Sequence, residues 1–262
     1  MSDAAGRGAE PVEMRILVVN PNTTASMTET IAAAARSAAG ASSRIVPVTS
    51  SMGPASIEGY YDEAMAVPGL LAEIGQGERL GAQAAIIACF DDTGLDAARA
   101  MVGIPVLGIC EAALSLASFI AQRFTVVTTT ERSRVPVEML VHRYGMSMRA
   151  RVRAAGIPVL ALEDPHSGAV ARLREEIAQA LEHDHAEAIV LGCAGMADLA
   201  ARLQAEFGVP VIDGVGAAVK QAEALVSLNL STSKRGAYAP PLAKPYSGVM
   251  DSLKPVAANP AA

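Results

Sequence analysis

The chain has 262 residues, 51% of them hydrophobic and 18% charged, so it can form one large or two small globular domains with a substantial core. A net charge of −6, with no tryptophan, 4 Phe and 5 Tyr, argues against nucleic acid or anionic lipid as a partner. The 3 cysteines, at positions 89, 110 and 193, form no CxxC pair, which argues against a disulfide scaffold or a compact zinc site.

The N-terminal segment and the most apolar segment of the chain show no pattern of export or membrane insertion. The first 13 residues contain no apolar stretch and do not resemble a signal peptide. Val102–Ala121 is largely apolar, but Pro105 and Gly108 interrupt it, so it predicts a strand, a turn and a helix. We therefore expect a cytoplasmic protein without a membrane partner, with flexible tails at 1–13 and 240–262.

Short runs of β-branched and aliphatic residues predict the strands of the fold. The runs are continuously apolar, which is typical of strands buried on both faces of a parallel sheet. In chain order they are Arg15–Asn20, Arg44–Thr49, Ala84–Ala88, Pro105–Ile109, Phe124–Thr128, Ile157–Leu162, Ala186–Leu191 and Val209–Ile212. Stretches with helical spacing lie between them, such as Thr24–Ala39 and Ala169–Leu181, and this alternation predicts an α/β fold.

The second half of the chain repeats the first. The matches are Val18–Asn20 with Val126–Thr128 at an offset of 108, Ala85–Cys89 with Ile189–Cys193 at 104, and Ile104–Leu107 with Val209–Ile212 at 105. Matches in the same order at a nearly constant offset indicate an internal duplication. We therefore predict two pseudo-symmetric α/β halves with a cleft between them.

This duplication places two cysteines where open α/β sheets bind their ligands, beyond the carboxyl ends of the strands. Cys89 and Cys193 each end a predicted strand and would enter one cleft from opposite sides. Each also comes just before a predicted helix, the second over Ala197–Glu206, where free N–H groups and the helix dipole favour a thiolate. Cys110 has Val215 as its repeat partner, so we expect it to be a small buried hydrophobic residue.

Two thiols on opposite sides of a cleft can invert a carbon acid, because a base is needed on one face of the carbon and an acid on the other. The simpler alternative is a pair of unrelated core cysteines, since free cysteine is often buried. No metal site is expected, because His183 and His185 lie at the far end of the strand that precedes Cys193.

Polar loops follow the first strand of each half. Asn20 leads through Pro21 into a helix with capping-box spacing from Ser26 to Glu29, and Thr128 occupies the corresponding strand end in the second half. Simple helix capping accounts for both loops, but Asn20 and Thr128 could also bind a substrate. Residues 53–61 form a second loop that either lines the cleft or is a plain surface connection.

The cysteine segments Ile87–Leu95 and Val190–Met196 belong to a longer pattern. It includes Ile16–Thr24, Gly53–Gly59, Asp62–Gly69, Pro210–Gly214, Thr232–Lys234 and Ala237–Ala239. Together these segments resemble the hydantoin racemases of the aspartate/glutamate racemase superfamily, from about Met14 to Tyr238. The two cysteine segments are the specific part of this resemblance.

The resemblance implies two similar α/β domains, each with a four-stranded parallel sheet flanked by helices, at 14–113 plus 212–230 and at 114–211. It also implies racemisation without a cofactor or metal, with Cys89 and Cys193 as the acid–base pair, and assembly into a homo-oligomer. By position in the family pattern, the residues expected to line the substrate pocket are Asn20, Pro21, Gly53, Pro54, Phe90, Asp91, Thr128, Ala194 and Gly195.

The residues themselves favour an uncharged ring over a free amino acid as substrate. Asp91 and Asp92 follow the first cysteine, and no Lys or Arg lies in the proposed cleft loops before Arg132, so a substrate carboxylate would lack a charged partner. A hydantoin is uncharged near neutral pH, and Phe90 with nearby aliphatic residues would accept its C5 substituent. We expect racemisation of 5-substituted hydantoins; an allantoin racemase, another isomerase of the superfamily and a non-catalytic ligand sensor stay open as alternatives.

Overall fold

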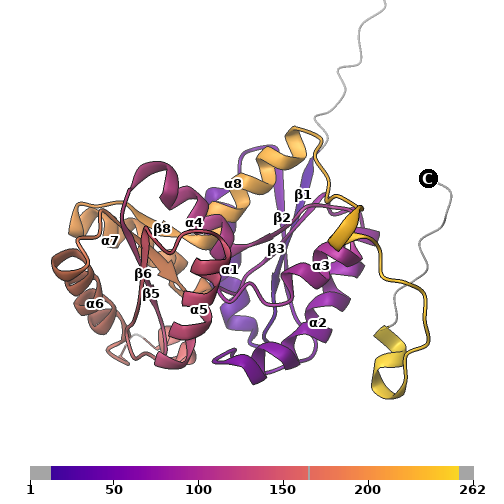
Figure 1. Ribbon diagram of the computed structural model, residues 1–262, viewed down its shortest axis with the longest axis horizontal. Coiled ribbons are helices and arrows are strands. Elements are labelled where there is room, and N and C mark those ends of the chain that lie inside the picture. Colours follow the sequence, from indigo (N-terminus) through magenta and orange to yellow (C-terminus); the bar gives the residue numbers. More distant parts are fainter. Residues whose placement is uncertain (1–12, 165, 254–262) are drawn as a thin grey trace, which may run out of the picture.

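The computed structural model describes residues 13–164 and 166–253 as two parallel four-stranded sheets covered by helices (Figure 1). This α/β architecture of two similar halves agrees with the prediction from the sequence. Most of the predicted tails, at 1–12 and 254–262, lies outside the described residues. Residues 240–247 contain no helix or strand and are followed by a 3₁₀ helix, Gly248–Leu253.

The two sheets have the same strand order relative to the chain, β2-β1-β3-β4 and β6-β5-β7-β8, and every pairing is parallel. The internal repeat of the sequence therefore corresponds to a repeat of the fold. The strands of the first sheet are β1 (Met14–Asn20), β2 (Ser43–Thr49), β3 (Ala84–Ile87) and β4 (Val106–Gly108). Those of the second are β5 (Phe124–Thr128), β6 (Ala150–Ala154), β7 (Ala188–Gly192) and β8 (Val211–Asp213).

Helices connect the strands and cover both faces of each sheet. They are α1 (Ala25–Ala38), α2 (Tyr60–Arg79), α3 (Leu95–Met101), α4 (Ile109–Ile120), α5 (Glu131–Arg143), α6 (Ala169–His183), α7 (Ala200–Phe207) and α8 (Gly214–Ser227). Strand side chains alternate between two cores: Ile16 and Val18 join the core shared by the two sheets, whereas Leu17 and Val19 pack on the other face, beneath α2 and α3. This double burial explains why β1 is continuously apolar.

Two helices cross between the halves. α4 follows β4 of the first sheet but packs against β7 and β8, and α8 follows β8 of the second sheet but packs against β1, β3 and β4. Since each half covers part of the other sheet, apolar packing sets the position of the two sheets relative to each other. Cys110 on α4 is fully buried in this shared core, as expected. The predicted division of the chain into domains remains a prediction, but its boundary at 211/212 falls inside β8.

One predicted strand is wrong. Ile157–Leu162 is apolar, but the strand of this region is β6, and Val159–Glu163 form a 3₁₀ helix. β6 lies at the edge of its sheet, where one side of the strand faces solvent, and its sequence contains Arg151 and Arg153 instead of a continuous apolar run. The apolar residues after it pack beside the end of the sheet, so hydrophobicity alone pointed to the wrong segment.

Other boundaries also differ from the prediction. The helix expected over Ala197–Glu206 is divided into a 3₁₀ helix, Ala194–Leu199, followed by α7. The predicted capping box at α1 is not formed: the N-cap is Thr24, without a side-chain cap, and the Ser26 hydroxyl bonds to Glu163 of the other half instead. The strand–turn–helix reading of Val102–Ala121 is confirmed by β4 and α4. Among the described helices, none combines the length and apolar character needed to cross a bilayer.

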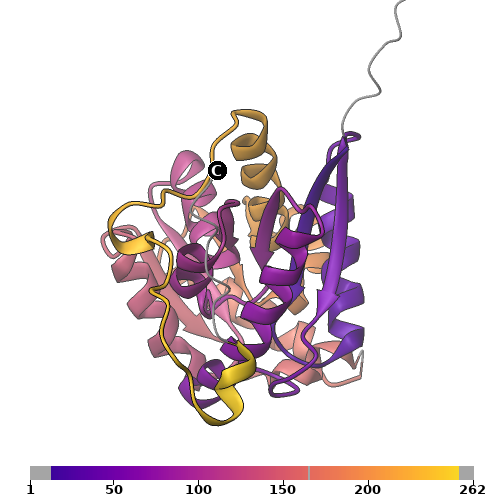
Figure 2. The same cartoon turned by 90° about the vertical axis from the view of Figure 1, so that its right-hand side faces the viewer.

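After α8 the chain returns along the first half. Figure 2 shows this segment running down the outside of the molecule. Thr232 bonds to the carbonyls of Gly103 and Ile104, and the Lys234 ammonium donates to carbonyls at the end of α3. The Tyr238 hydroxyl donates to Asp96 in the first turn of α3. The segment thus holds α3, the helix that follows Cys89, at both ends.

Candidate active site

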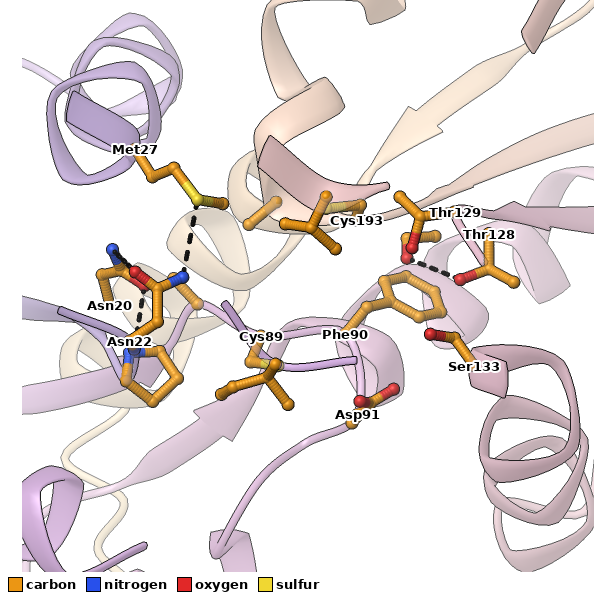
Figure 3. Close-up of a pocket in the computed structure, with 16 residues that line it drawn as sticks. Asn20, Asn22, Met27, Cys89, Phe90, Asp91, Thr128, Thr129, Ser133 and Cys193 are labelled. Carbon is orange, nitrogen blue, oxygen red and sulfur yellow. Dashed lines mark hydrogen bonds between the residues drawn. The ribbon is translucent and has the colours of Figure 1, made fainter. Parts of the chain in front are cut away.

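A pocket lies between the two halves, at the carboxyl ends of β1, β3, β5 and β7 (Figure 3). Its empty volume is about 420 Å³, part of it open to solvent. The lining residues are Asn20, Pro21, Asn22, Met27, Ile57, Ala88, Cys89, Phe90, Asp91, Thr128, Thr129, Ser133, Val159, Gly192, Cys193 and Ala194.

Cys89 and Cys193 both line this pocket, one from each half. Cys89 comes two residues after the end of β3, and Cys193 directly follows β7. Figure 3 shows them on opposite sides of the cavity. Both side chains are partly exposed, whereas Cys110 is buried, so the two pocket thiols are accessible to a small molecule. The sequence-based placement of the two cysteines in one cleft thus agrees with the geometry.

The surroundings of the two sulfurs favour the thiol form, in contrast to the expectation from helix N-termini. Burial raises the pKa of Cys193 to about 11, and the charges of Asp91 and Glu58 add to this rise, while the Gly195 N–H opposes it. Burial also raises the pKa of Cys89 well above its ordinary value, as do the charges of Asp91 and Cys193. One backbone N–H at each sulfur lowers the pKa, but desolvation is the larger effect.

Asp91 brings a carboxyl group into the pocket between two other acidic side chains. Its side chain is 9% exposed, and burial raises its pKa to about 7, with further contributions from the charges of Glu63 and Asp92. Burial also raises the pKa of Glu63. Asp91 therefore changes charge close to neutral pH, and its charge acts on both pocket cysteines.

Asp92 does not line the pocket but holds the segment that carries Cys89. Its carboxylate accepts hydrogen bonds from the N–H groups of Cys110 and Glu111, at 3.0 Å each, and so caps α4. The Tyr144 hydroxyl, at the end of α5 in the other half, donates to the same carboxylate at 2.7 Å. A side chain at Gly108 would collide with this cap, since its Cβ would lie 2.2 Å from Asp92 Oδ1.

The polar side chains at the ends of β1 and β5 are engaged within the protein. The Asn20 amide donates to Asn22, Thr24 and Thr28, and the Thr128 hydroxyl donates to the Gly192 carbonyl. Both residues line the pocket, as predicted, but their side chains also shape the loops around it. Thr24 and Thr130 occupy the N-cap positions of α1 and α5 without a side-chain cap, so these loops are not simple capping motifs.

Not every residue predicted for the pocket lines it. Pro21, Phe90, Asp91 and Ala194 do, together with the residues already described, but Gly53, Pro54 and Gly195 are absent from the lining. The Pro54 carbonyl accepts hydrogen bonds from Thr23, so the loop after β2 supports the Asn20 loop from behind. Gly195 lies next to the pocket, where a Cβ would come within 3.7 Å of the Cys193 sulfur.

Eight of the lining residues were not expected from the sequence. Met27 and Ser133 occupy the first turns of α1 and α5, equivalent positions in the repeat, and the rule that ligands bind beyond strand ends could have included them. Ile57 comes from a loop of the first half and Val159 from the start of a 3₁₀ helix of the second half, and the Glu58 carboxylate accepts a hydrogen bond from the Val159 N–H. No local pattern marks that contact. The eight are Asn22, Met27, Ile57, Ala88, Thr129, Ser133, Val159 and Gly192.

The described lining of the pocket contains few charged side chains. Among the described residues that line it there is no Lys or Arg, and Asp91 is the acidic one. In residues 13–164 and 166–253, no three or more His, Cys, Asp or Glu side chains are grouped in a way that could hold a metal ion. The groups that the pocket offers for proton transfer are thus two thiols and one carboxyl.

A pocket with one thiol from each of two duplicated α/β halves has the two proton-carrying groups, on opposite sides, that inversion at a carbon acid needs. The model of the Asp/Glu/Hydantoin racemase family matches residues 16–222, and the chain belongs to this family. It is an isomerase of the racemase type. Among curated proteins, it is 49% identical to a hydantoin racemase of Pseudomonas sp. (strain NS671), over 92% of this chain and 97% of that protein. It is 51% identical to one of Rhizobium meliloti, over 90% and 98%.

Solved structures that are similar to this chain include racemases of other substrates. An allantoin racemase from Klebsiella pneumoniae superposes with a TM-score of 0.90 and 48% identity, covering 93% of this chain and all of that one. An allantoin racemase from Pseudomonas fluorescens gives 0.86 and 40%, covering 90% of this chain. A glutamate racemase of Bacillus anthracis, at 0.60 and 14% identity, shares the fold.

Proposed function

We propose that this enzyme racemises 5-substituted hydantoins by proton transfer between two cysteines, without a cofactor. The observation that carries the proposal is that Cys89 and Cys193 reach one pocket from opposite halves of the fold. Inversion at a carbon acid needs two proton-carrying groups, one on each side of the carbon. The similarity to hydantoin racemases supports the choice of substrate.

In this mechanism one cysteine acts as a thiolate and the other as a thiol. The thiolate removes the C5 proton, and the electron pair of the C–H bond moves into the adjacent carbonyl to form an enolate. The opposite thiol then donates its proton to C5 on the other face, which inverts the centre and leaves the second sulfur as the thiolate. Backbone N–H groups after each cysteine, such as those of Asp91 and Gly195, are available near the reacting atoms.

The two sulfurs exchange roles with the enantiomer that is bound. Burial raises the pKa of both thiols, and the charge of Asp91 adds to the rise at each of them. Inversion of one enantiomer therefore uses Cys89 as the proton donor, and inversion of the other uses Cys193.

The lining of the pocket suits an uncharged ring with an apolar substituent. A substrate carboxylate would meet the Asp91 carboxyl and no cationic side chain of the described lining. Met27, Ile57, Phe90 and Val159 form the apolar part of the wall and would contact the C5 group. The ring amides could pair with polar groups such as Thr129 and Ser133.

Allantoin is the second candidate substrate. It is a hydantoin with a polar ureido group at C5, and the chain is 48% identical to the Klebsiella allantoin racemase over nearly all of both chains. Asn22, Thr129 and Ser133 give the pocket donors and acceptors that a ureido group could use. The reaction and the roles of the two cysteines are the same for both substrates.

The test is racemisation of single enantiomers in heavy water, without added metal or cofactor. We expect loss of optical rotation together with deuterium uptake at C5, fastest for the preferred substrate among allantoin and a series of alkyl- and aryl-substituted hydantoins. Unchanged rotation across the whole series would contradict the proposal. Sedimentation of the enzyme and localisation in cells would address the homo-oligomer and the cytoplasmic location, which we also propose.

A further inference from the structure

One buried polar group beside the pocket has no partner. The Thr93 side chain is completely buried, and its hydroxyl makes no hydrogen bond within the described part of the chain. A buried hydroxyl without a partner destabilises a fold, because it has lost its bonds to water and gained none in return. Such a group therefore calls for a role that offsets this cost.

The hydroxyl is placed next to the sulfur of Cys89. The two residues belong to the segment between β3 and α3, where the Asp92 N–H bonds to the Cys89 carbonyl and the Leu95 N–H bonds to the Asp92 carbonyl. Asp92 has a positive φ of 46°, and its side chain is fastened to α4 and Tyr144. These bonds hold the segment in a tight turn. In this turn the Thr93 hydroxyl lies close enough to the Cys89 sulfur to lower the pKa of its thiol.

The second half has no equivalent of this hydroxyl. Position 197 stands four residues after Cys193, as position 93 stands four residues after Cys89, and it holds Ala197. Ala197 is buried in the core shared by the two sheets. The two cysteines are thus equivalent in the fold, but the Thr93 hydroxyl helps to lower the pKa of Cys89, whereas at Cys193 the lowering comes from the Gly195 N–H.

We propose that Thr93 is a positioning residue that donates a hydrogen bond to the Cys89 thiolate when it forms during turnover. The inference rests on the proposed two-cysteine racemisation. In the free enzyme Cys89 is a thiol, a weak acceptor, and the hydroxyl remains unpaired. After Cys89 gives its proton to C5 it becomes an anion, and the adjacent O–H can then complete a charge-assisted hydrogen bond.

Cys89 needs such a donor more than Cys193 does. The charges that raise its pKa are those of Asp91, whose own pKa is raised by the charge of Glu63, and of Cys193 across the pocket. When Cys89 is the anion, Cys193 holds the C5 proton and is neutral, so the charge that opposes the anion is that of Asp91. Thr93 and the Asp91 N–H are the two groups that oppose this.

The test compares Thr93→Val, which keeps the shape but removes the hydroxyl, with Thr93→Ser, which keeps the hydroxyl. Iodoacetamide labelling, followed residue by residue by mass spectrometry across pH 7 to 10, reports the thiolate of each cysteine. We expect Thr93→Val to slow the alkylation of Cys89 by about tenfold, equivalent to about one pKa unit, and to leave that of Cys193 unchanged. Thr93→Ser should restore the rate, and Ala197→Ser should leave Cys89 unaffected.

Racemisation and stability complete the test. The pH profile of kcat/KM should move to higher pH in Thr93→Val and return in Thr93→Ser, while the melting temperature of Thr93→Val stays equal or rises because an unpaired buried hydroxyl is removed. Equal Cys89 labelling in wild type and Thr93→Val would overturn the inference even if the enzyme racemises hydantoins. Failure of the wild type to racemise any hydantoin or allantoin would instead reject the proposed function, and the labelling data would still report the contact.

Discussion

The segments that follow the two pocket cysteines show how a duplicated fold can hold two different environments. After Cys193 the chain enters a 3₁₀ helix at once, through Ala194 and Gly195, with small side chains. After Cys89 it makes a turn with two carboxyl groups, Asp91 and Asp92, before α3 begins at Leu95. The fold gives both sulfurs equivalent positions, where burial raises the pKa of each thiol, and the groups that follow each cysteine modify that rise.

The same contrast continues at the helices α4 and α8. Asp213, at the end of β8, caps α8 with its own side chain through the N–H groups of Val215 and Gly216. The equivalent position in the first half is Gly108, and the cap of α4 comes instead from Asp92, in the segment that carries Cys89. Because position 108 is glycine, the carboxylate of Asp92 fits beside it and caps α4. This cap connects the segment that carries Cys89 to the core.

The largest effect is expected from the two cysteines themselves. Cys89→Ser and Cys193→Ser should each lower racemisation by about 10³-fold or more, since a serine hydroxyl is a much weaker acid than a thiol. Each variant should still exchange the C5 proton of the enantiomer that faces its remaining thiol, with retention of configuration. Chiral chromatography and deuterium NMR measure the two rates separately, and Cys110→Ser is the control. Near-normal racemisation by either pocket variant would refute the two-base assignment.

A second effect concerns Asp91 and pH. Its pKa is about 7 in the folded protein and near 4 when unfolded, so the folded state holds the proton more tightly, and this stabilisation is lost as pH rises from about 4 through 7. In the wild type, the free energy of unfolding should therefore fall by about 2–4 kcal/mol between pH 4 and pH 8 because of this carboxyl. In Asp91→Asn this fall should be absent. Urea denaturation at several pH values measures it.

Asp184→Asn is the matched control for that experiment. Arg153 holds the pKa of Asp184 below its ordinary value, so Asp184 contributes stability above about pH 4 that is lost on acidification. Its replacement should leave the decrease toward alkaline pH in place. An unaltered pH dependence in Asp91→Asn would show that the carboxyl is ionised throughout this range.

The contact between Tyr144 and Asp92 should have a moderate effect. Tyr144→Phe leaves the buried Asp92 carboxylate with one donor fewer and should lower the free energy of unfolding by about 1–3 kcal/mol. The neighbouring Arg143→Met breaks the half-exposed ion pair with Asp96 and should cost less than about 1 kcal/mol. Chemical denaturation of the two variants side by side makes the comparison, and equal losses would argue against a special role for Tyr144.

The smallest effect is expected at the helix cap of the second half. Asp213→Ala removes the acceptor for two N–H groups of α8 and should cost about 1 kcal/mol, with Asp213→Asn as the conservative control. Racemisation should be nearly unchanged, since Asp213 does not line the pocket. Asp92→Ala should lower both stability and activity, because it releases the Cys89 segment. Similar activity of the two Ala variants would contradict the link between that cap and the site.

Local sequence patterns identified much of the fold and part of the site. Continuous apolar runs located seven of the eight strands, and the repeat brought Cys89 and Cys193 to one cleft. The pattern failed at β6, an edge strand with two arginines, because an exposed edge does not require apolar side chains on both faces. The family resemblance implied Gly53 and Pro54 as pocket residues; the described lining contains Ile57 from the loop after β2 but neither of these two.

The sequence by itself determined the α/β class, the duplication and the pair of cysteines, because these depend on side-chain periodicity and on spacing along the chain. Only the tertiary structure decided which loops close the pocket, how Asp92 caps a helix from 18 residues away, and that burial raises the pKa of both thiols. These properties arise from contacts between distant segments and from the exclusion of water. The local order of residues along the chain reveals neither the contacts nor the exclusion of water.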